Sequence, residues 1–175
     1  MKKQDILENQ VNYAYLALGS NLGKKIKNLE FAKYKLTKIG INIIKTSGYY
    51  RSKSWPNNKF PYFINSVLFV STKLILTELF KEIKLIEKSL GRLKTPKNYP
   101  RTCDIDIIDF NGKCISLKFN SQKIQVPHLN MHKRNFVLVP LYEINQKWLH
   151  PKFKKNIVNL LSSLSHYELI SIKFS

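Results

Sequence analysis

The sequence predicts an α+β domain, in which helices pack on an antiparallel or mixed β-sheet. Short apolar segments bounded by turn residues recur along the chain, and two stretches between them place apolar residues at helical spacing. The chain has 175 residues, of which 43% are hydrophobic and 12% aromatic, which is enough for one sizeable core. We therefore expect one domain over residues 1–175, with residues 1–12 and 165–175 peripheral.

The first part of the chain alternates strands with helices. A continuous apolar run is typical of a strand buried on both faces, and the turn sequence Gly19-Ser20-Asn21-Leu22-Gly23 ends the first such run. Gly40 ends the helix that follows, and a loop over 53–61 precedes the third strand. The predicted elements are a strand at 11–18, a helix at 24–39, a strand at 41–50 and a strand at 63–72.

The second part of the chain completes a βαββαβ order. Gly91 ends a second amphipathic helix, and the fourth strand is expected to be central in the sheet. This order matches the split βαβ arrangement of ferredoxin-like domains. A short hairpin is expected near Asn111-Gly112. The remaining predicted elements are a helix at 76–90, a strand at 102–110, helices at 131–144 and 157–164, and an edge strand at 168–174.

The formal charge of +19 invites a nucleic-acid-binding interpretation. Only four of the 30 basic residues are arginine, however, and the rest are lysine, which suits a solvated surface. Because lysine serves almost everywhere, the few arginines are expected where a planar fork of donors is needed. Three of them, Arg92, Arg101 and Arg134, fall in segments with other signs of a site.

Targeting and redox features indicate a cytoplasmic, reduced protein. The first residues carry acids and no apolar core, so no secretory signal is expected. No window approaches the length of a membrane span, so no membrane partner is expected either. Cys103 and Cys114 form neither a disulfide framework nor a metal-binding pair.

Two carboxylates, Asp104 and Asp106, carry the strongest chemical signal. Alternate residues of a strand share one face, so these side chains lie together. Such a pair is costly unless a cation sits between its members, and Mg²⁺ typically uses one or two carboxylates plus substrate phosphates. The alternative is a pair of exposed acids at the end of a strand. Asp109 is out of phase, on the opposite face, and we exclude it from the metal site.

Basic and aromatic residues flank this pair in sequence. The segment from Arg92 to Arg101 suits a lid over a polyphosphate, and a mobile solvated loop is the alternative. The turn at 19–25 is not a P-loop, since it has too few residues between its glycines and no Ser or Thr after the lysine. His128 follows a proline and lies near Arg134 in sequence. The other histidines, at 132, 150 and 166, we interpret as packed or surface residues.

Taken in order, these motifs resemble 6-hydroxymethyl-7,8-dihydropterin pyrophosphokinase, a folate-pathway enzyme family. The resemblance runs from about residue 13 to residue 151. The matching stretches are Ala14–Gly23, Tyr49–Ser52, Phe63–Asn65, Ile86–Arg92, Pro100–Ile107, Val126–His128, Arg134–Phe136 and Pro140-Leu141.

The resemblance implies a ferredoxin-like core with two Mg²⁺ ions held by Asp104 and Asp106. It also implies ATP as co-substrate and a pterin sandwiched between Phe63 and Phe136, with Asn65 hydrogen-bonded to the ring and Ser52 beside it. Arg92 and Arg101 would act in catalysis together with the two aspartates. The residues implied for ATP are Glu87, Arg92, Lys97, Arg101, Lys123, His128 and Arg134.

The implied reaction is in-line attack by the pterin hydroxymethyl oxygen on the β-phosphorus of ATP, with release of AMP. No general base is evident. The partners are then the two small-molecule substrates, with no nucleic acid, and the chain is expected to act as a monomer. The main rival is an RNA-binding ferredoxin-like module, which would leave the Asp pair unexplained. A second rival, a glycosyltransferase with a D-x-D motif, needs a larger nucleotide-sugar domain.

Overall fold

The computed structural model describes residues 10–54, 59–92 and 99–175. In these residues six strands form a sheet in the order β5-β1-β4-β3-β8, with β2 also paired to β4. Every pairing in this sheet is antiparallel. Its strands are β1 (Asn12–Ser20), β2 (Asn42–Thr46), β3 (Tyr50–Ser52), β4 (Phe63–Thr72), β5 (Asp104–Phe110) and β8 (Lys173–Phe174). A separate antiparallel pair consists of β6 (Ile115–Phe119) and β7 (Gln122–Val126).

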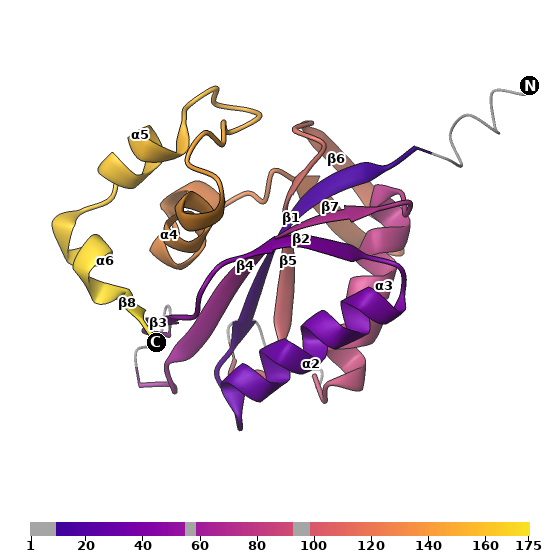
Figure 1. Cartoon of the computed structure of the whole chain (residues 1–175), viewed down its shortest axis with the longest axis horizontal. Coiled ribbons are helices and arrows are strands. Elements are labelled where there is room, and N and C mark those ends of the chain that lie inside the picture. The colour runs from indigo at the N-terminus through magenta and orange to yellow at the C-terminus, as the bar shows by residue number, and fades with distance from the viewer. Residues whose placement is uncertain (1–9, 55–58, 93–98) are drawn as a thin grey trace, which may run out of the picture.

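Helices cover both faces of the sheet (Figure 1). The helices are α2 (Lys25–Lys38), α3 (Leu76–Ser89), α4 (Asn135–Ile144), α5 (Ile157–Ser162) and α6 (His166–Ser171), with a 3₁₀ turn at Met131–Lys133. Leu16 and Leu18 of β1 pack in the core under α2 and α3, whereas Tyr15 and Ala17 pack under α4 and α5. This alternation confirms that the first strand is buried on both faces.

The predicted α+β class and the βαββαβ order are confirmed, with adjustments at several element ends. The strand expected over 41–50 divides into β2 and β3. Ser47 lies between them, where its Oγ accepts a hydrogen bond from Val67 N (2.9 Å). The helix expected over 131–144 begins with the 3₁₀ turn, and α4 starts only at Asn135.

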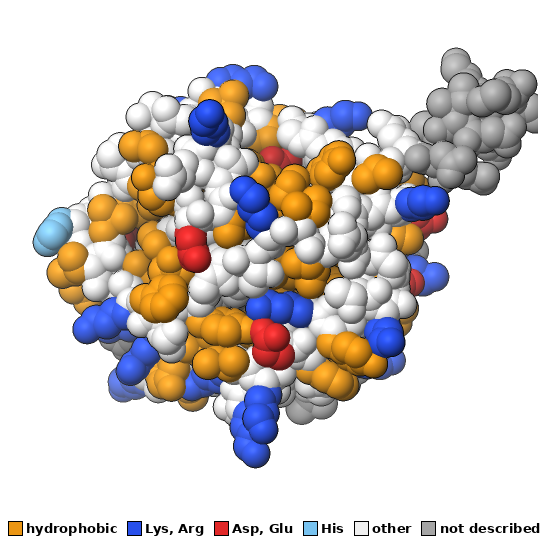
Figure 2. All heavy atoms as spheres, in the orientation of Figure 1, with side chains coloured by type: hydrophobic (Ala, Val, Ile, Leu, Met, Phe, Trp, Pro, Cys, Tyr) orange, Lys and Arg blue, Asp and Glu red, His pale blue; other side chains and the backbone are white. Residues whose placement is uncertain are grey.

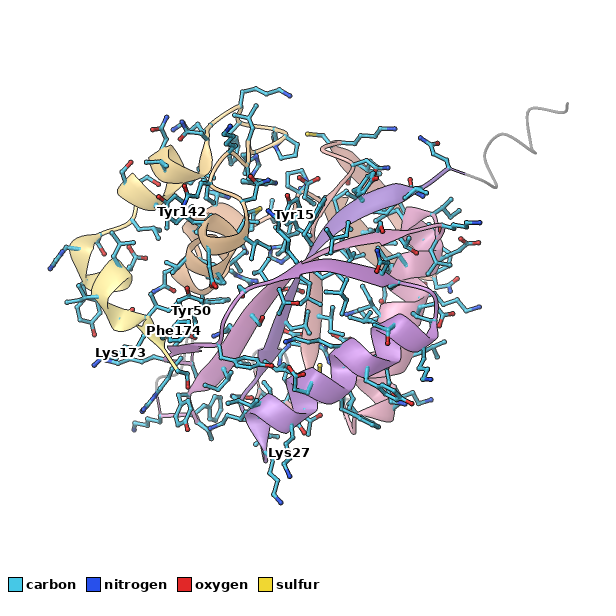
Figure 3. The ribbon with its side chains drawn as sticks, viewed as in Figure 1. Tyr15, Lys27, Tyr50, Tyr142, Lys173 and Phe174 are labelled. Carbon is cyan, nitrogen blue, oxygen red and sulfur yellow. The ribbon has the colours of Figure 1, made fainter. Side chains whose placement is uncertain are left out.

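The strand expected over 168–174 is mostly helical, because α6 occupies His166–Ser171. Ser165 and Glu168 form a capping box: the Ser165 side chain accepts from Glu168 N, and the Glu168 carboxylate accepts from Ser165 N. That S-x-x-E signature was available in the sequence and predicts a helix start. Only β8 adds to the sheet edge. There Phe174 meets the Tyr50 ring edge-on, at 5.4 Å between centroids (Figure 3).

The fourth strand of the core, β5, lies at the edge of the sheet rather than at its centre. The side chains of β5 are buried on both faces of the sheet, which is the pattern typical of a central strand. Glu87 covers the edge by accepting a hydrogen bond from Ile105 N (2.8 Å), and His128 N donates to Ile108 O (3.1 Å). The open edge is therefore blocked by a carboxylate from α3 and by the chain that follows β7.

Asp109 does not lie on the opposite face from the Asp pair. The register between β1 and β5 shifts at Tyr15/Leu16, so one extra residue is accommodated in β5. Such a bulge breaks the alternation of side chains and turns Asp109 toward the α4 layer. There its Oδ2 accepts from the Trp148 indole N–H (2.9 Å). Asp109 is thus engaged in the second core, away from Asp104 and Asp106.

His150 is buried beside Trp148 and Phe153, with 2% of its surface exposed. Its Nδ1 accepts from the backbone amides of Lys152 and Phe153, both at 3.2 Å. Burial, assisted by His132 and Lys152, lowers the pKa of His150 to about 4 from 6.5. This agrees with the interpretation of His150 as a packed residue.

The buried His150 predicts that stability falls as the pH falls from about 6.5 to about 4. In this window the unfolded chain binds a proton that the folded chain does not, at a cost of up to about 1.4 kcal/mol per pH unit. His150→Asn keeps an acceptor for the two amides but cannot titrate. Its Tm, measured at pH 7.5 and pH 5.0, should fall less than that of the wild type. Equal losses would contradict this explanation.

Lysine and arginine side chains are scattered over the face shown in Figure 2, among apolar and uncharged ones. This distribution suits a solvated surface better than a single basic patch on that face. In the described part of the chain, no helix combines the length and the apolar character needed to cross a bilayer.

Candidate active site

Asp104 and Asp106 lie on the same face of β5, as the alternation predicted. In the register of the sheet, Asp104 pairs with Gly19 and Asp106 with Ala17 of β1. On the other side of β1, Gly19 pairs with Asn65 of β4. Gly19 therefore lies between Asp104 and Asn65, and Ala17 lies between Asp106 and Val67. These two small residues form the floor of a site that crosses three strands.

Two arginines hold the first carboxylate from the direction of α3 and of the chain preceding β5. Arg92 Nη1 lies 2.7 Å from Asp104 Oδ1, and Arg101 Nη1 lies 3.0 Å from Asp104 Oδ2. Burial alone would raise the pKa of Asp104, but the attraction of Arg101 and Arg92 outweighs it and keeps the pKa below its ordinary value. Asp104 is therefore a carboxylate at neutral pH.

The second carboxylate meets residues from the start of α4 and from the chain after β7. Arg134 Nη1 lies 3.2 Å from Asp106 Oδ2, and His128 Nε2 lies 3.8 Å from the same oxygen. Burial lowers the pKa of His128 despite the nearby Asp106 charge. His128 is thus neutral at pH 7, and its imidazole can form hydrogen bonds without adding a charge.

Three of the four arginines of the chain converge on these two aspartates, as their scarcity suggested. The Asp104 and Asp106 side chains remain 25% and 30% exposed, so a ligand can reach them. Among described residues there is no cluster of three or more His, Cys, Asp or Glu that could hold a metal. Two accessible carboxylates on one face nevertheless fit Mg²⁺, which completes its shell with water and phosphate oxygens.

Glu87 lies behind this group, with 1% of its surface exposed. One carboxylate oxygen accepts from Ile105 N and contacts Arg92, and the other lies 2.8 Å from Lys84 Nζ. Burial raises the pKa of Glu87, against the attraction of Lys84 and Arg92. With both oxygens engaged, Glu87 is placed to orient Arg92 and to fix the start of β5.

Ser52, Phe63 and Asn65 lie together on the other side of Gly19. Asn65 Nδ2 donates to Ser52 Oγ (2.9 Å) and to Tyr50 O (3.2 Å). A Cβ placed on Gly19 would lie 3.3 Å from Asn65 Oδ1 and 3.5 Å from the Phe63 ring. The amide oxygen and the ring therefore lie over the bare backbone of Gly19. Phe136 lies on α4, where its half-buried ring is 5.6 Å from the Arg134 guanidinium.

Two residues implied by the resemblance are not placed in this group. Lys97 lies outside the described residues. Lys123 is exposed on β7, where its register partner on β6 is Lys118. The roles of both in ATP binding stay predictions.

Asn21 belongs to this site but was not predicted from the sequence. It is buried, with 1% of its surface exposed, and it bonds to the backbone of Arg101 through both its own backbone and its side chain. The G-S-N-x-G motif was explained by turn chemistry alone. An asparagine in such a turn can also bond to distant segments, and local spacing in the sequence does not reveal those bonds.

A ferredoxin-like sheet that carries paired carboxylates ringed by arginines provides groups that can hold a metal ion and a phosphorylated ligand. Residues 15–146 match the family described as 7,8-dihydro-6-hydroxymethylpterin-pyrophosphokinase. The chain belongs to this family, as its motifs suggested.

Similar proteins include short and long chains. The 2-amino-4-hydroxy-6-hydroxymethyldihydropteridine pyrophosphokinase of Haemophilus influenzae is 30% identical over 160 residues, which cover 91% of this chain and 97% of that protein. The protein of the same name from Aquifex aeolicus is 38% identical over 141 residues, covering 81% and 85%. The folic acid synthesis protein fol1 of Pneumocystis carinii is 38% identical over 170 residues, covering 97% of this chain but only 21% of that protein.

The fold is also that of a solved Plasmodium falciparum HPPK-DHPS structure. The TM-score is 0.74 at 17% identity, and the match covers 98% of this chain and 49% of that one. This chain therefore spans about half of that structure and about a fifth of the fungal relative.

Proposed function

We propose that this chain transfers the pyrophosphoryl group of ATP to the hydroxymethyl group of 6-hydroxymethyl-7,8-dihydropterin, giving the pterin diphosphate and AMP. The observation that carries the proposal is the row from Asp104 across Gly19 to Asn65. In this row, the carboxylates and arginines that suit phosphates lie directly beside the amide and the aromatic ring that suit a planar ring. The names of the relatives that this chain covers most fully support the same reaction.

On the phosphate side, the arginines supply planar donor forks to the polyphosphate. In the structure these arginines are paired with Asp104 and Asp106, the two residues that would hold Mg²⁺. A bound metal would neutralise charge on the phosphate oxygens and leave the arginine forks to the phosphates. Arg92, Arg101 and Arg134 then surround the group that is transferred, and neutral His128 adds a hydrogen bond.

On the pterin side, Asn65 is held in one orientation by Ser52 and by Tyr50 O. Its amide nitrogen is occupied, so the oxygen above Gly19 is the group that can accept from an N–H of the pterin ring. Phe63 and Phe136 supply apolar surfaces that fix the plane of the ring for attack. Action as a monomer stays a prediction.

The RNA-binding alternative has no support. An RNA-binding module would leave the paired carboxylates on the face of the sheet beside α4 unexplained. The family match accounts for the same residues.

The reaction is tested by incubating the protein with ATP and Mg²⁺, with and without the pterin, and following phosphorus species by NMR. The expected products are AMP and a pterin diphosphate, formed only when pterin and metal are both present. Formation of ADP would show phosphoryl rather than pyrophosphoryl transfer. No pterin-dependent turnover of folded protein would refute the proposed function.

Gly19→Ala is expected to raise the KM for the pterin about tenfold, because the methyl group would crowd Asn65 Oδ1 at 3.3 Å and cover the bare backbone beside the Phe63 ring. The KM for ATP should change little, since the new group faces the pterin side. Steady-state kinetics with each substrate varied would check this. An equal rise in both values would contradict the position given to the pterin.

A further inference from the structure

Asn21 connects three segments that are far apart in sequence. Its backbone N–H donates to Arg101 O (3.1 Å), and its Oδ1 accepts from Arg101 N (2.7 Å). Its Nδ2 donates to Ser54 Oγ and to Pro61 O, both at 3.3 Å. One side chain at the end of β1 therefore holds the backbone of Arg101 and both ends of the connection from β3 to β4.

The two sides of Asn21 belong to the two halves of the site. Arg101 reaches Asp104 with its guanidinium, on the phosphate side. Ser54 and Pro61 lie near the two ends of the connection between Ser52 and Phe63. Both Ser52 and Phe63 are assigned to the pterin side. Ser54 Oγ also donates to Pro61 O (2.6 Å), so the two partners of Asn21 Nδ2 are bonded to each other.

Burial makes these bonds interdependent. With 1% of its surface exposed, the Asn21 amide cannot replace a lost partner with bulk water. If Ser54 and Pro61 moved away, the buried Nδ2 would be left without either of these partners. The bonds to Ser54 and Pro61 therefore hold the Asn21 amide with its Oδ1 facing Arg101 N. The bond to Arg101 N in turn holds Nδ2 facing Ser54 and Pro61.

We propose that Asn21 is a positioning residue that links Arg101 to the pterin-side segment, so that both halves of the site keep one relative placement. It touches neither the carboxylates nor the Phe63 ring in any contact found in the described residues. Its effect on the reaction therefore passes through Arg101 and through Ser54 and Pro61. The proposal rests on the proposed function.

Three variants separate this role from a purely structural one. Asn21→Ala removes the side-chain bonds to both segments and keeps only the backbone bond to Arg101 O; it is expected to raise the KM for ATP and the KM for the pterin about tenfold each, with a fall in kcat. Ser54→Ala removes one of the two pterin-side acceptors of Asn21 Nδ2 and leaves Pro61 O in place. It should raise the KM for the pterin about threefold and leave the KM for ATP unchanged.

Asn28→Ala is the matched control. Its Nδ2 donates to Ser20 Oγ and Leu22 O within the same turn and reaches no other part of the site. It should lower Tm without changing either KM. The effects of Asn21→Ala and Ser54→Ala on the KM for the pterin should be less than additive in the double variant, since both remove the bond between Asn21 and Ser54 and only the bond from Ser54 to Pro61 O is lost in addition.

Two outcomes would overturn the proposal while leaving the function intact. One is an active wild type whose KM values do not change in Asn21→Ala. The other is equal kinetic losses in Asn21→Ala and Asn28→Ala at matched Tm loss. A wild type without pterin-dependent AMP release would instead refute the proposed function. Calorimetric titration of the pterin in the presence of a non-hydrolysable ATP analogue gives the same comparison without turnover.

Discussion

Replacing Asp106 by alanine is expected to lower pterin-dependent AMP release by at least about a thousandfold, since a metal clamp on phosphate oxygens supplies several kcal/mol of transition-state stabilisation. Among the described residues, Asp104 and Asp106 are the two carboxylates beside the arginines that a metal could use, and Asp106 also orients Arg134 at 3.2 Å. The loss should appear mainly in kcat. Raising the Mg²⁺ concentration should not restore it.

Asp109→Ala is the control for this prediction. It removes a carboxylate from the same strand, but one that bonds to Trp148 and to Gly112 N in the second core. The variant should lose stability, seen as a lower Tm, and keep its requirement for Mg²⁺ unchanged. If Asp106→Ala kept metal-dependent turnover within tenfold of the wild type, the metal site would have to lie elsewhere.

Arg101→Ala is expected to lower kcat/KM for ATP by about a hundredfold or more, in the range seen when a preorganised donor to a developing charge is removed. Arg101→Lys should recover only part of this loss, because an ammonium group keeps the charge but not the planar fork. Removing Arg101 also relieves Asp104 of one of its two cations. We therefore expect the pKa of Asp104 to be higher in Arg101→Ala than in the wild type.

Arg51 provides the matched control. Its guanidinium lies over the Tyr62 ring at 4.1 Å, and it is the arginine that does not join the Asp104 and Asp106 group. Arg51→Ala should leave kcat/KM for ATP within about twofold of the wild type, because substitutions of surface residues away from a site usually have small effects. Equal losses in the two alanine variants would mean that overall charge, not the fork of Arg101, governs ATP binding.

Local patterns were sufficient for most of the fold. The apolar runs and helical spacing predicted the βαββαβ order because strand and helix periods follow from backbone geometry. The same rule placed Asp104 and Asp106 on one face, where the register confirms them. It failed at Asp109, because one extra residue in β5 shifts the alternation and depends on how β1 pairs with its neighbour.

Sequence by itself determined the fold class, the carboxylate pair and the arginines expected near it, since each depends on residue type and short-range spacing. Only the tertiary structure decided that β5 is an edge strand, that Glu87 covers it, and that Asn21 binds Arg101. The Asn21–Arg101 bond spans 80 residues, and the bond from Glu87 to Ile105 joins a helix to a strand. Such contacts form because buried polar groups must find partners as the layers close, and no local pattern specifies which partners those are.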